Sequence, residues 1–158
     1  LDCGCGGGAN IKTLLKLCHN GKVHGIDYSA VSVEKARKVN ARAIAAGRCA
    51  VQQASVTELP FKAEQFDVVT AFETVYFWPE LAQNFREVYR VLKPGGVFFI
   101  CNEANGETTK DDKWTQIING MTIYTDTALK AYLEQAGFCQ IQSHKNKKGW
   151  LCVTAQKR

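Results

Sequence analysis

The sequence lacks a run of about 20 apolar residues, the length that a helix needs to cross a bilayer. It also lacks a signal-like N-terminus. Hydrophobic residues make up 46% and charged residues 22% of the 158 residues, values close to those of folded domains, which excludes a disordered chain and a coiled coil. We therefore expect a soluble globular protein with no membrane partner.

Paired cysteine motifs are also missing, although the chain has seven cysteines. Their number is odd, and the one close pair, Cys3 and Cys5, has no second pair or histidine pair that would complete a zinc site. We expect reduced thiols, no metal and a cytoplasmic location. The chain contains no P-loop and no nucleophile elbow, which removes two common nucleotide- and ester-cleaving mechanisms.

The charge balance gives no sign of a nucleic-acid partner. The chain has 20 Lys and Arg against 15 Asp and Glu, a net charge of +5. A nucleic-acid-binding protein needs a basic face interleaved with aromatic residues. The dense basic cluster at Lys145, Lys147 and Lys148 falls in a predicted polar turn, and a solvated turn explains it more simply than a nucleic-acid site does.

The sequence does contain a regular alternation of strand and helix patterns. Apolar residues indicate strands at 23–27, 49–54, 66–71 and 97–101. Helical spacing indicates helices at 10–20, 29–46, 79–93, 114–121 and 125–136. Pro79 is expected in the first turn of the third helix, and the ranges 138–144 and 150–155 predict a β-hairpin.

This alternation predicts an α/β fold: a doubly wound, mostly parallel sheet with helices on both faces and a C-terminal antiparallel hairpin. We expect residues 1–158 to form a single domain. The chain opens inside the first strand without an initiator Met, so we expect its N-terminal part to be missing. The sequence leaves the oligomeric state open.

A glycine-rich loop follows that first strand, in the segment Leu1-Asp2-Cys3-Gly4-Cys5-Gly6-Gly7-Gly8-Ala9. Alternate glycines let the backbone turn tightly and let a ligand approach main-chain atoms. Ligands of such sheets bind at the carboxyl ends of the strands. The loop therefore indicates a nucleotide site, although by itself it also fits the pattern of dinucleotide-binding proteins.

Two carboxylates narrow the choice of nucleotide. Asp27 closes the second predicted strand, where a carboxylate can accept hydrogen bonds from both ribose hydroxyls; the alternative is a solvated residue at a strand end. Asp2 precedes the glycines, where its charge would repel a pyrophosphate but suits a ligand with an ammonium and a sulfonium group.

Together these motifs resemble class I S-adenosylmethionine-dependent methyltransferases over nearly the whole chain. Asp2-x-Gly4-x-Gly6-x-Gly8 is similar to the family's first motif, and Asp27 falls on its ribose acid. Segments similar to later motifs are Leu59-Pro60-Phe61, Phe66-Asp67-Val68-Val69 and Leu92-Lys93-Pro94-Gly95-Gly96. The resemblance implies S-adenosylmethionine as cofactor and in-line transfer of its methyl group to an O, N, S or C atom of a small-molecule acceptor.

The resemblance also implies a set of cofactor-binding residues. They are Asp2, Gly4, Cys5, Gly6, Asp27, Tyr28, Ser55, Val56, Ala71 and Phe72. Asp2, Gly4 and Gly6 are expected around the methionine part of the cofactor, and Tyr28 against its adenine. Ser55 departs from the family, which commonly has an Asp there, so adenine recognition is expected to depend on the backbone of Val56.

The segment after the fourth predicted strand is expected to line the acceptor pocket. Glu73 and Tyr76 are the candidate catalytic residues, with Glu73 as a general base where the acceptor must lose a proton. The alternative is that the aromatic residues 76–78 only pack the next helix. Trp114, Met121 and Trp150 could reach a substrate pocket, but we favour packing for all three. Two other functions stay open: a noncatalytic cofactor-binding subunit or inactive fragment, and a nicotinamide-dependent oxidoreductase.

Overall fold

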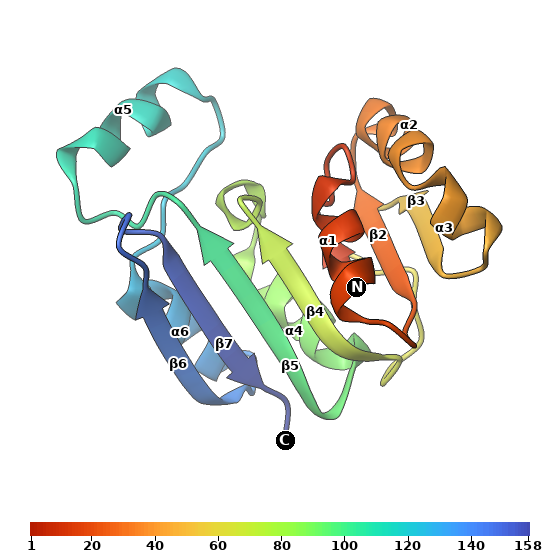
Figure 1. Cartoon of the computed structure of the whole chain (residues 1–158). Helices are drawn as coiled ribbons and strands as arrows, with labels where there is room; N and C mark the ends of the chain where they lie inside the picture. The colour runs from red at the N-terminus through yellow and green to blue at the C-terminus, as the bar shows by residue number, and fades with distance from the viewer.

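The computed structural model describes the backbone of residues 1–158 and all side chains except those of Thr109, Lys110 and Asp112. A seven-stranded sheet in the order β3-β2-β1-β4-β5-β7-β6 forms its centre (Figure 1). The strands are β1 Asp2–Cys3, β2 Val23–Asp27, β3 Cys49–Gln53, β4 Phe66–Phe72, β5 Leu92–Asn102, β6 Cys139–Lys145 and β7 Leu151–Gln156. Strands β1 to β5 pair in parallel, and β7 pairs antiparallel with β5 and β6. The predicted α/β architecture is confirmed.

Helices cover both faces of this sheet (Figure 1). They are α1 Ala9–Leu17, α2 Ala30–Val39, α3 Ala41–Ala45, α4 Leu81–Val91, α5 Thr109–Ile117 and α6 Asp126–Gln135, with a short 3-10 turn, η1, at Val75–Phe77. A smaller apolar cluster, including Ile11 and Val33, packs α1 and α2 on the sheet. A larger cluster, including Phe85, Phe98 and Leu133, joins α4 and α6 to the sheet. None of the described helices has the length and apolar character of a membrane span.

The helix predicted at 29–46 is divided, because α2 and α3 are separate helices that meet at Asn40. The Asn40 side chain is 4% exposed. Its amide nitrogen donates to the carbonyl of Gly8 at 3.0 Å and to that of Ala36 at 3.0 Å. A buried side chain that binds another element in this way holds the backbone out of helical geometry at that position (φ −108°, ψ 18°).

The boundaries of the third predicted helix are also different. Pro79 precedes the helix instead of lying in its first turn, because Glu80 has a left-handed φ of 44° and α4 begins after it. The following strand, predicted at 97–101, begins at Leu92. Its register against β4 shifts between Phe66 and Val68, which accommodates the proline and glycines of the turn.

The strand order indicates at which edge of the sheet a ligand can bind. β1 pairs with both β2 and β4, so the direction of winding reverses between β1 and β4. Ligands of open α/β sheets bind at such a point, outside the carboxyl ends of the strands. Gly4 follows β1 there, Asp27 ends β2 and Glu73 follows β4.

The Asn40 contacts generate a test of the fold. Replacing Asn40 with Ala removes both side-chain hydrogen bonds and leaves the Gly8 carbonyl without this donor, so the free energy of unfolding should fall by about 1–3 kcal/mol. Urea unfolding followed by circular dichroism measures this change. The matched control is Asn20→Ala at an exposed position, which should change stability by less than about 0.5 kcal/mol; equal effects of the two substitutions would contradict the assigned role.

Candidate functional site

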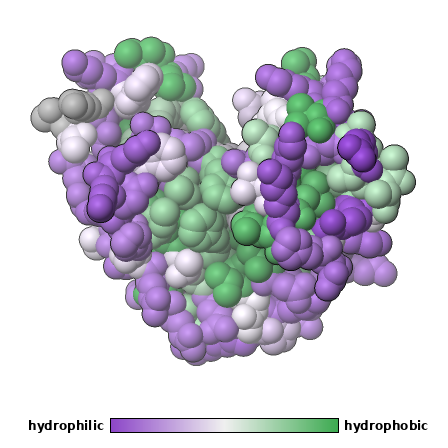
Figure 2. Space-filling model, in the orientation of Figure 1, coloured by the Kyte–Doolittle hydropathy of each residue, from purple (hydrophilic) through white to green (hydrophobic). Residues whose placement is uncertain are grey.

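A cavity of about 420 Å³ opens at the carboxyl ends of the strands. Figure 2 shows the molecule hollowed at this edge, between the part that carries α5 and the part that carries α1 and α2. Five residues predicted to bind the cofactor line the cavity: Gly4, Asp27, Tyr28, Ser55 and Val56. They come from the loops after β1, β2 and β3, which agrees with a ligand lying across the switch point.

Eight lining residues were not among the predicted cofactor-binding residues. They are Ile26, Ala54, Thr74, Phe77, Trp78, Pro79, Asn119 and Gly120. Ile26 and Ala54 adjoin predicted positions, and residues 74–79 fall in the segment that was expected to line the acceptor pocket. Asn119 and Gly120 follow α5, far away in sequence, and no local pattern indicates their position.

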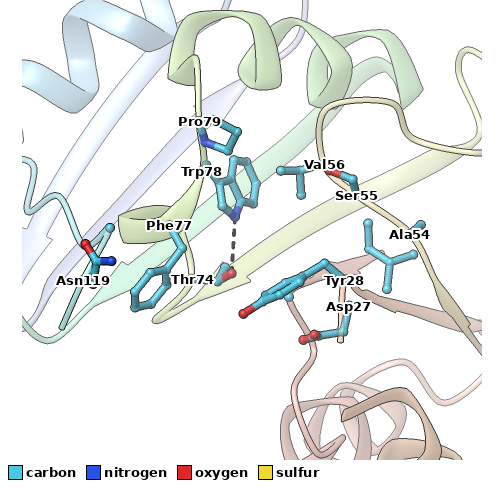
Figure 3. Close-up of a pocket in the computed structure, with 13 residues that line it drawn as sticks. Asp27, Tyr28, Ala54, Ser55, Val56, Thr74, Phe77, Trp78, Pro79 and Asn119 are labelled. Carbon is cyan, nitrogen blue, oxygen red and sulfur yellow. Dashed lines mark hydrogen bonds between the residues drawn. The ribbon is translucent and has the colours of Figure 1, made fainter. Parts of the chain in front are cut away.

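The Asp27 carboxylate is held in place by two backbone donors. The Gly6 N–H donates to Oδ2 at 2.9 Å and the Ser29 N–H to Oδ1 at 2.9 Å. The residue is only 8% exposed and its carboxylate faces the cavity (Figure 3). Because an ionised carboxylate has about four acceptor positions, each oxygen can still accept a bond from a ligand. Two neighbouring hydroxyls, as in a ribose, match this arrangement.

Asp2 has a different environment and does not line the cavity. It is 1% exposed, and its Oδ1 accepts a hydrogen bond from the Thr70 hydroxyl at 2.8 Å. Its Oδ2 is buried and has no hydrogen-bond partner among the described residues. Burial raises the pKa of Asp2 to about 6, with the nearby Asp27 charge as a smaller cause. A buried carboxylate of this kind is stabilised by a positively charged neighbour.

Gly4, after β1, lies very close to Thr74, after β4. Gly4 has a φ of 72°, and a Cβ atom on it would overlap the Thr74 side chain. Thr74 in turn accepts the indole N–H of Trp78 at 3.3 Å, which directs the ring into the cavity (Figure 3). Trp78 also stacks on Phe98 in the core, with ring centroids 6.2 Å apart. It therefore both packs α4 and lines the cavity.

The other predicted cofactor-binding residues lie outside the cavity lining. Gly6 holds Asp27, and Cys5 is buried in the smaller apolar cluster, next to Gly25. Ala71 is fully buried in β4, and the ring of Phe72 lies against Phe99 on β5. These residues position the lining rather than form it.

A second cavity of about 310 Å³ adjoins the first. It is lined by Glu73, Tyr76, Phe77, Glu103, Ala104, Trp114, Ile118 and Met121. Phe77 borders both cavities, and both draw on the segment after α5. Both candidate catalytic residues are here. Trp114 and Met121 line this cavity as well, and Trp114 is 51% exposed, which favours the alternative that they reach the acceptor pocket over the packing that we favoured.

Glu73 and Tyr76 form a hydrogen-bonded group at the edge of this cavity. Glu73 has a left-handed φ of 55°, an unfavourable conformation for a residue with a side chain. Its carboxylate accepts the Glu103 N–H and lies 3.4 Å from the Tyr76 hydroxyl. That hydroxyl accepts the Ala104 N–H at 2.9 Å. The backbone strain is thus offset by contacts that fix the carboxylate at the cavity.

The protonation states of these two groups follow from their surroundings. Glu73 is exposed as a residue, but its carboxyl group contacts the Glu103 N–H and the Tyr76 hydroxyl, and its partial desolvation raises its pKa. Burial, together with the adjacent Glu73 charge, raises the pKa of Tyr76 far above neutral pH. Tyr76 therefore keeps its proton and orients Glu73, which is the group able to exchange a proton.

Comparison with known proteins agrees with this geometry. Residues 1–100 match the family model described as a methyltransferase domain. The chain belongs to this methyltransferase family. The family implies S-adenosylmethionine as methyl donor. Three features of the site fit that molecule: the open acceptor positions of Asp27, the unpaired buried oxygen of Asp2 and the glycine cradle at Gly4.

Individual relatives support the same fold. The chain is 30% identical over 123 residues to the 24-methylenesterol C-methyltransferase 2 of Arabidopsis thaliana, an alignment that covers 77% of this chain and 34% of that protein. A methyltransferase structure from Aquifex aeolicus gives a TM-score of 0.83 at 21% identity, covering 99% of this chain and 80% of the other. The cyclase SpnF gives 0.78 at 20% identity, with 99% and 74% covered. The chain spans about a third of the length of the first curated relatives that it matches.

The Asp27 geometry predicts the cofactor affinity of a variant. Asp27→Asn replaces one carboxylate oxygen with an NH₂ group that faces a backbone N–H, and it removes charge-assisted bonds to the ligand. The affinity for S-adenosylhomocysteine, measured by titration calorimetry, should fall about tenfold or more. The matched control, Asp67→Asn, changes an exposed carboxylate paired with Lys93 on the sheet. An unchanged affinity in the Asp27 variant would remove Asp27 from the site.

The buried Asp2 predicts a pH dependence of stability. Its folded-state pKa of about 6 lies above the ordinary value, so the folded state holds the proton more tightly than the unfolded state. Stability should therefore fall as pH rises from about 4 to about 6.5, by about 2–3 kcal/mol relative to an Asp2→Asn variant. Urea unfolding at several pH values measures this. The control Asp67→Asn should give the opposite sign, because Lys93 lowers the pKa of Asp67; the same sign for both would contradict the assignment.

Proposed function

We propose that this chain transfers the methyl group of S-adenosylmethionine to a small-molecule acceptor held in the second cavity. The observation that carries the proposal is the junction of the two cavities. Phe77 borders both, Ile118 and Met121 line the second, and Asn119 and Gly120, between them in sequence, line the first. A donor in one cavity and an acceptor in the other would meet at this wall.

The chain's own residues supply binding, orientation and exclusion of water. S-adenosylmethionine, when bound, supplies a methyl group on a positively charged sulfur. Asp27 and the glycine loop hold the nucleoside end of the site in a fixed position. Phe77 and Trp78 present aromatic surface where the cavities meet, and a dry site with fixed partners favours displacement chemistry. Glu73 receives a proton from acceptors that must lose one.

The acceptor that we propose has a substantial apolar part. The second cavity is walled by Phe77, Trp114, Ile118 and Met121, and its polar groups gather at the Glu73 end. Such a cavity favours a molecule with an apolar body and one reactive polar or unsaturated position. Sterol-like molecules satisfy this description, and the Arabidopsis relative is named as a methylenesterol C-methyltransferase.

Binding and turnover together test the proposal. Calorimetry should show saturable binding of S-adenosylhomocysteine and none of NAD. Incubation with S-adenosylmethionine labelled in its methyl group should transfer label to an acceptor of a panel containing sterols, phenols and amines, with sterols preferred. Because a cyclase shares the fold, turnover is the deciding measurement. Binding without transfer to any member would favour a noncatalytic cofactor-binding protein, and binding of NAD would favour an oxidoreductase.

The Glu73 group predicts a kinetic effect. With an acceptor that must lose a proton, Glu73→Gln should lower kcat about a hundredfold while leaving the affinity for S-adenosylhomocysteine unchanged. The wild-type rate should rise with pH as Glu73 loses its proton and then level off, with the midpoint above the ordinary carboxyl pKa because its pKa is raised. The variant should lose this rise. Glu103→Gln, at the same cavity, is the matched control and should keep kcat; wild-type turnover in the Glu73 variant would dismiss the base.

A further inference from the structure

The net charge of the chain comes from one part of the sequence. Residues 1–57 hold eight Lys and Arg against three Asp and Glu, whereas residues 58–158 hold twelve of each. Two of the three acids, Asp2 and Asp27, are buried at the candidate site, with 1% and 8% exposed. The surface formed by α1, α2 and α3 therefore carries an excess of positive charge that the proposed function does not use.

These cations surround a groove between α1 and the pair α2–α3. The groove has a volume of about 540 Å³. α1 and α2–α3 lie at the same side of the sheet (Figure 1). Lys12 and Lys16 lie on the α1 side, and Lys38 and Arg42 lie on the opposite side. All four side chains are exposed, so they can reach a bound molecule.

Little negative charge compensates this groove. Glu34 is the only acid in α1, α2 and α3, and it pairs with Lys38 at 2.7 Å. Lys12, Lys16 and Arg42 form no ion pair with a residue whose side chain is described. Uncompensated charges around a concave surface concentrate the field there and attract an anionic partner.

The floor of the groove is largely apolar. Leu15 and Ala43 are half-buried in it, and Val39 is 47% exposed. Asn40 lies at the base, where its bond to Gly8 ties the groove to α1.

We propose that this groove binds an acidic segment of a partner polypeptide that also carries an aliphatic side chain. Carboxylates match Lys12, Lys16 and Arg42, and an aliphatic side chain matches the floor. The concave shape suits a protruding segment rather than a flat membrane surface. No aromatic residue lines the groove, so it has no platform for the base stacking on which single-stranded nucleic acids depend. Binding here is independent of methyl transfer.

The test uses a fluorescein-labelled peptide of repeated Glu-Glu-Leu units and fluorescence anisotropy with the whole chain. The peptide should bind saturably, with weaker binding at high salt, and a version with Gln in place of Glu should not bind. The groove variant Lys12→Gln/Lys16→Gln/Arg42→Gln should weaken binding at least tenfold. The matched control Lys113→Gln/Lys147→Gln/Lys148→Gln removes three exposed cations elsewhere and should bind like the parent chain.

Both variants should keep the circular dichroism spectrum and the S-adenosylhomocysteine affinity of the parent chain, which separates this proposal from the proposed function. Equal loss in the two triple variants would overturn the proposal, because general attraction to a basic chain would then explain binding. Polyuridine RNA or phosphatidylserine vesicles binding more tightly than the peptide, with only the groove variant losing that binding, would overturn the ligand class. No saturable binding of the peptide would overturn the site.

Discussion

The glycine loop after β1 is the constraint on which the candidate site depends. Three of its glycines are each in contact with a different element. Gly4 lies so close to Thr74, after β4, that a side chain cannot fit between them. The N–H of Gly6 binds Asp27 at the end of β2, and the carbonyl of Gly8 accepts from Asn40 between α2 and α3. The loop therefore fixes the wall of the first cavity, the Asp27 carboxylate and the base of the cationic groove together.

Asp2 and Asp27, the two acids beside this loop, differ in their hydrogen-bond partners more than in their burial. Both are nearly buried, but Asp27 accepts a backbone N–H at each oxygen, whereas one oxygen of Asp2 has no described partner. Asp27 is thus a preorganised acceptor whose orientation costs nothing further when a ligand binds. Asp2 is an uncompensated carboxylate that a cationic ligand would stabilise. The same residue type thus has two different environments beside one loop, in β1 and at the end of β2.

Much of the fold was predictable from local patterns. The strands β2 and β4 and the final hairpin follow from apolar runs bounded by turn residues, and the helix at Asp126 begins where Thr125 caps it. The break at Asn40 was not predictable, because its cause is a contact with Gly8, 32 positions away. The same holds for Asn119 and Gly120 in the cavity: their segment is placed by the bond from the Thr122 N–H to the Tyr76 carbonyl at 2.8 Å. The groove cations were missed because they are dispersed in sequence and gather only when α1 packs beside α2 and α3.

The two cavities differ in how many of their lining residues lie within the part of the chain that matches the family. The family match ends at residue 100. Eleven of the thirteen residues that line the first cavity lie within it, and only Asn119 and Gly120 lie beyond it. Glu103, Ala104, Trp114, Ile118 and Met121 lie beyond it, and they form most of the second. The part of the chain that matches the family thus forms most of the first cavity, whereas α5 and its neighbouring segments form most of the second. Residues that line the second cavity can change while those that line the first stay the same. One fold can therefore carry different chemistry, and a cyclase has a similar fold.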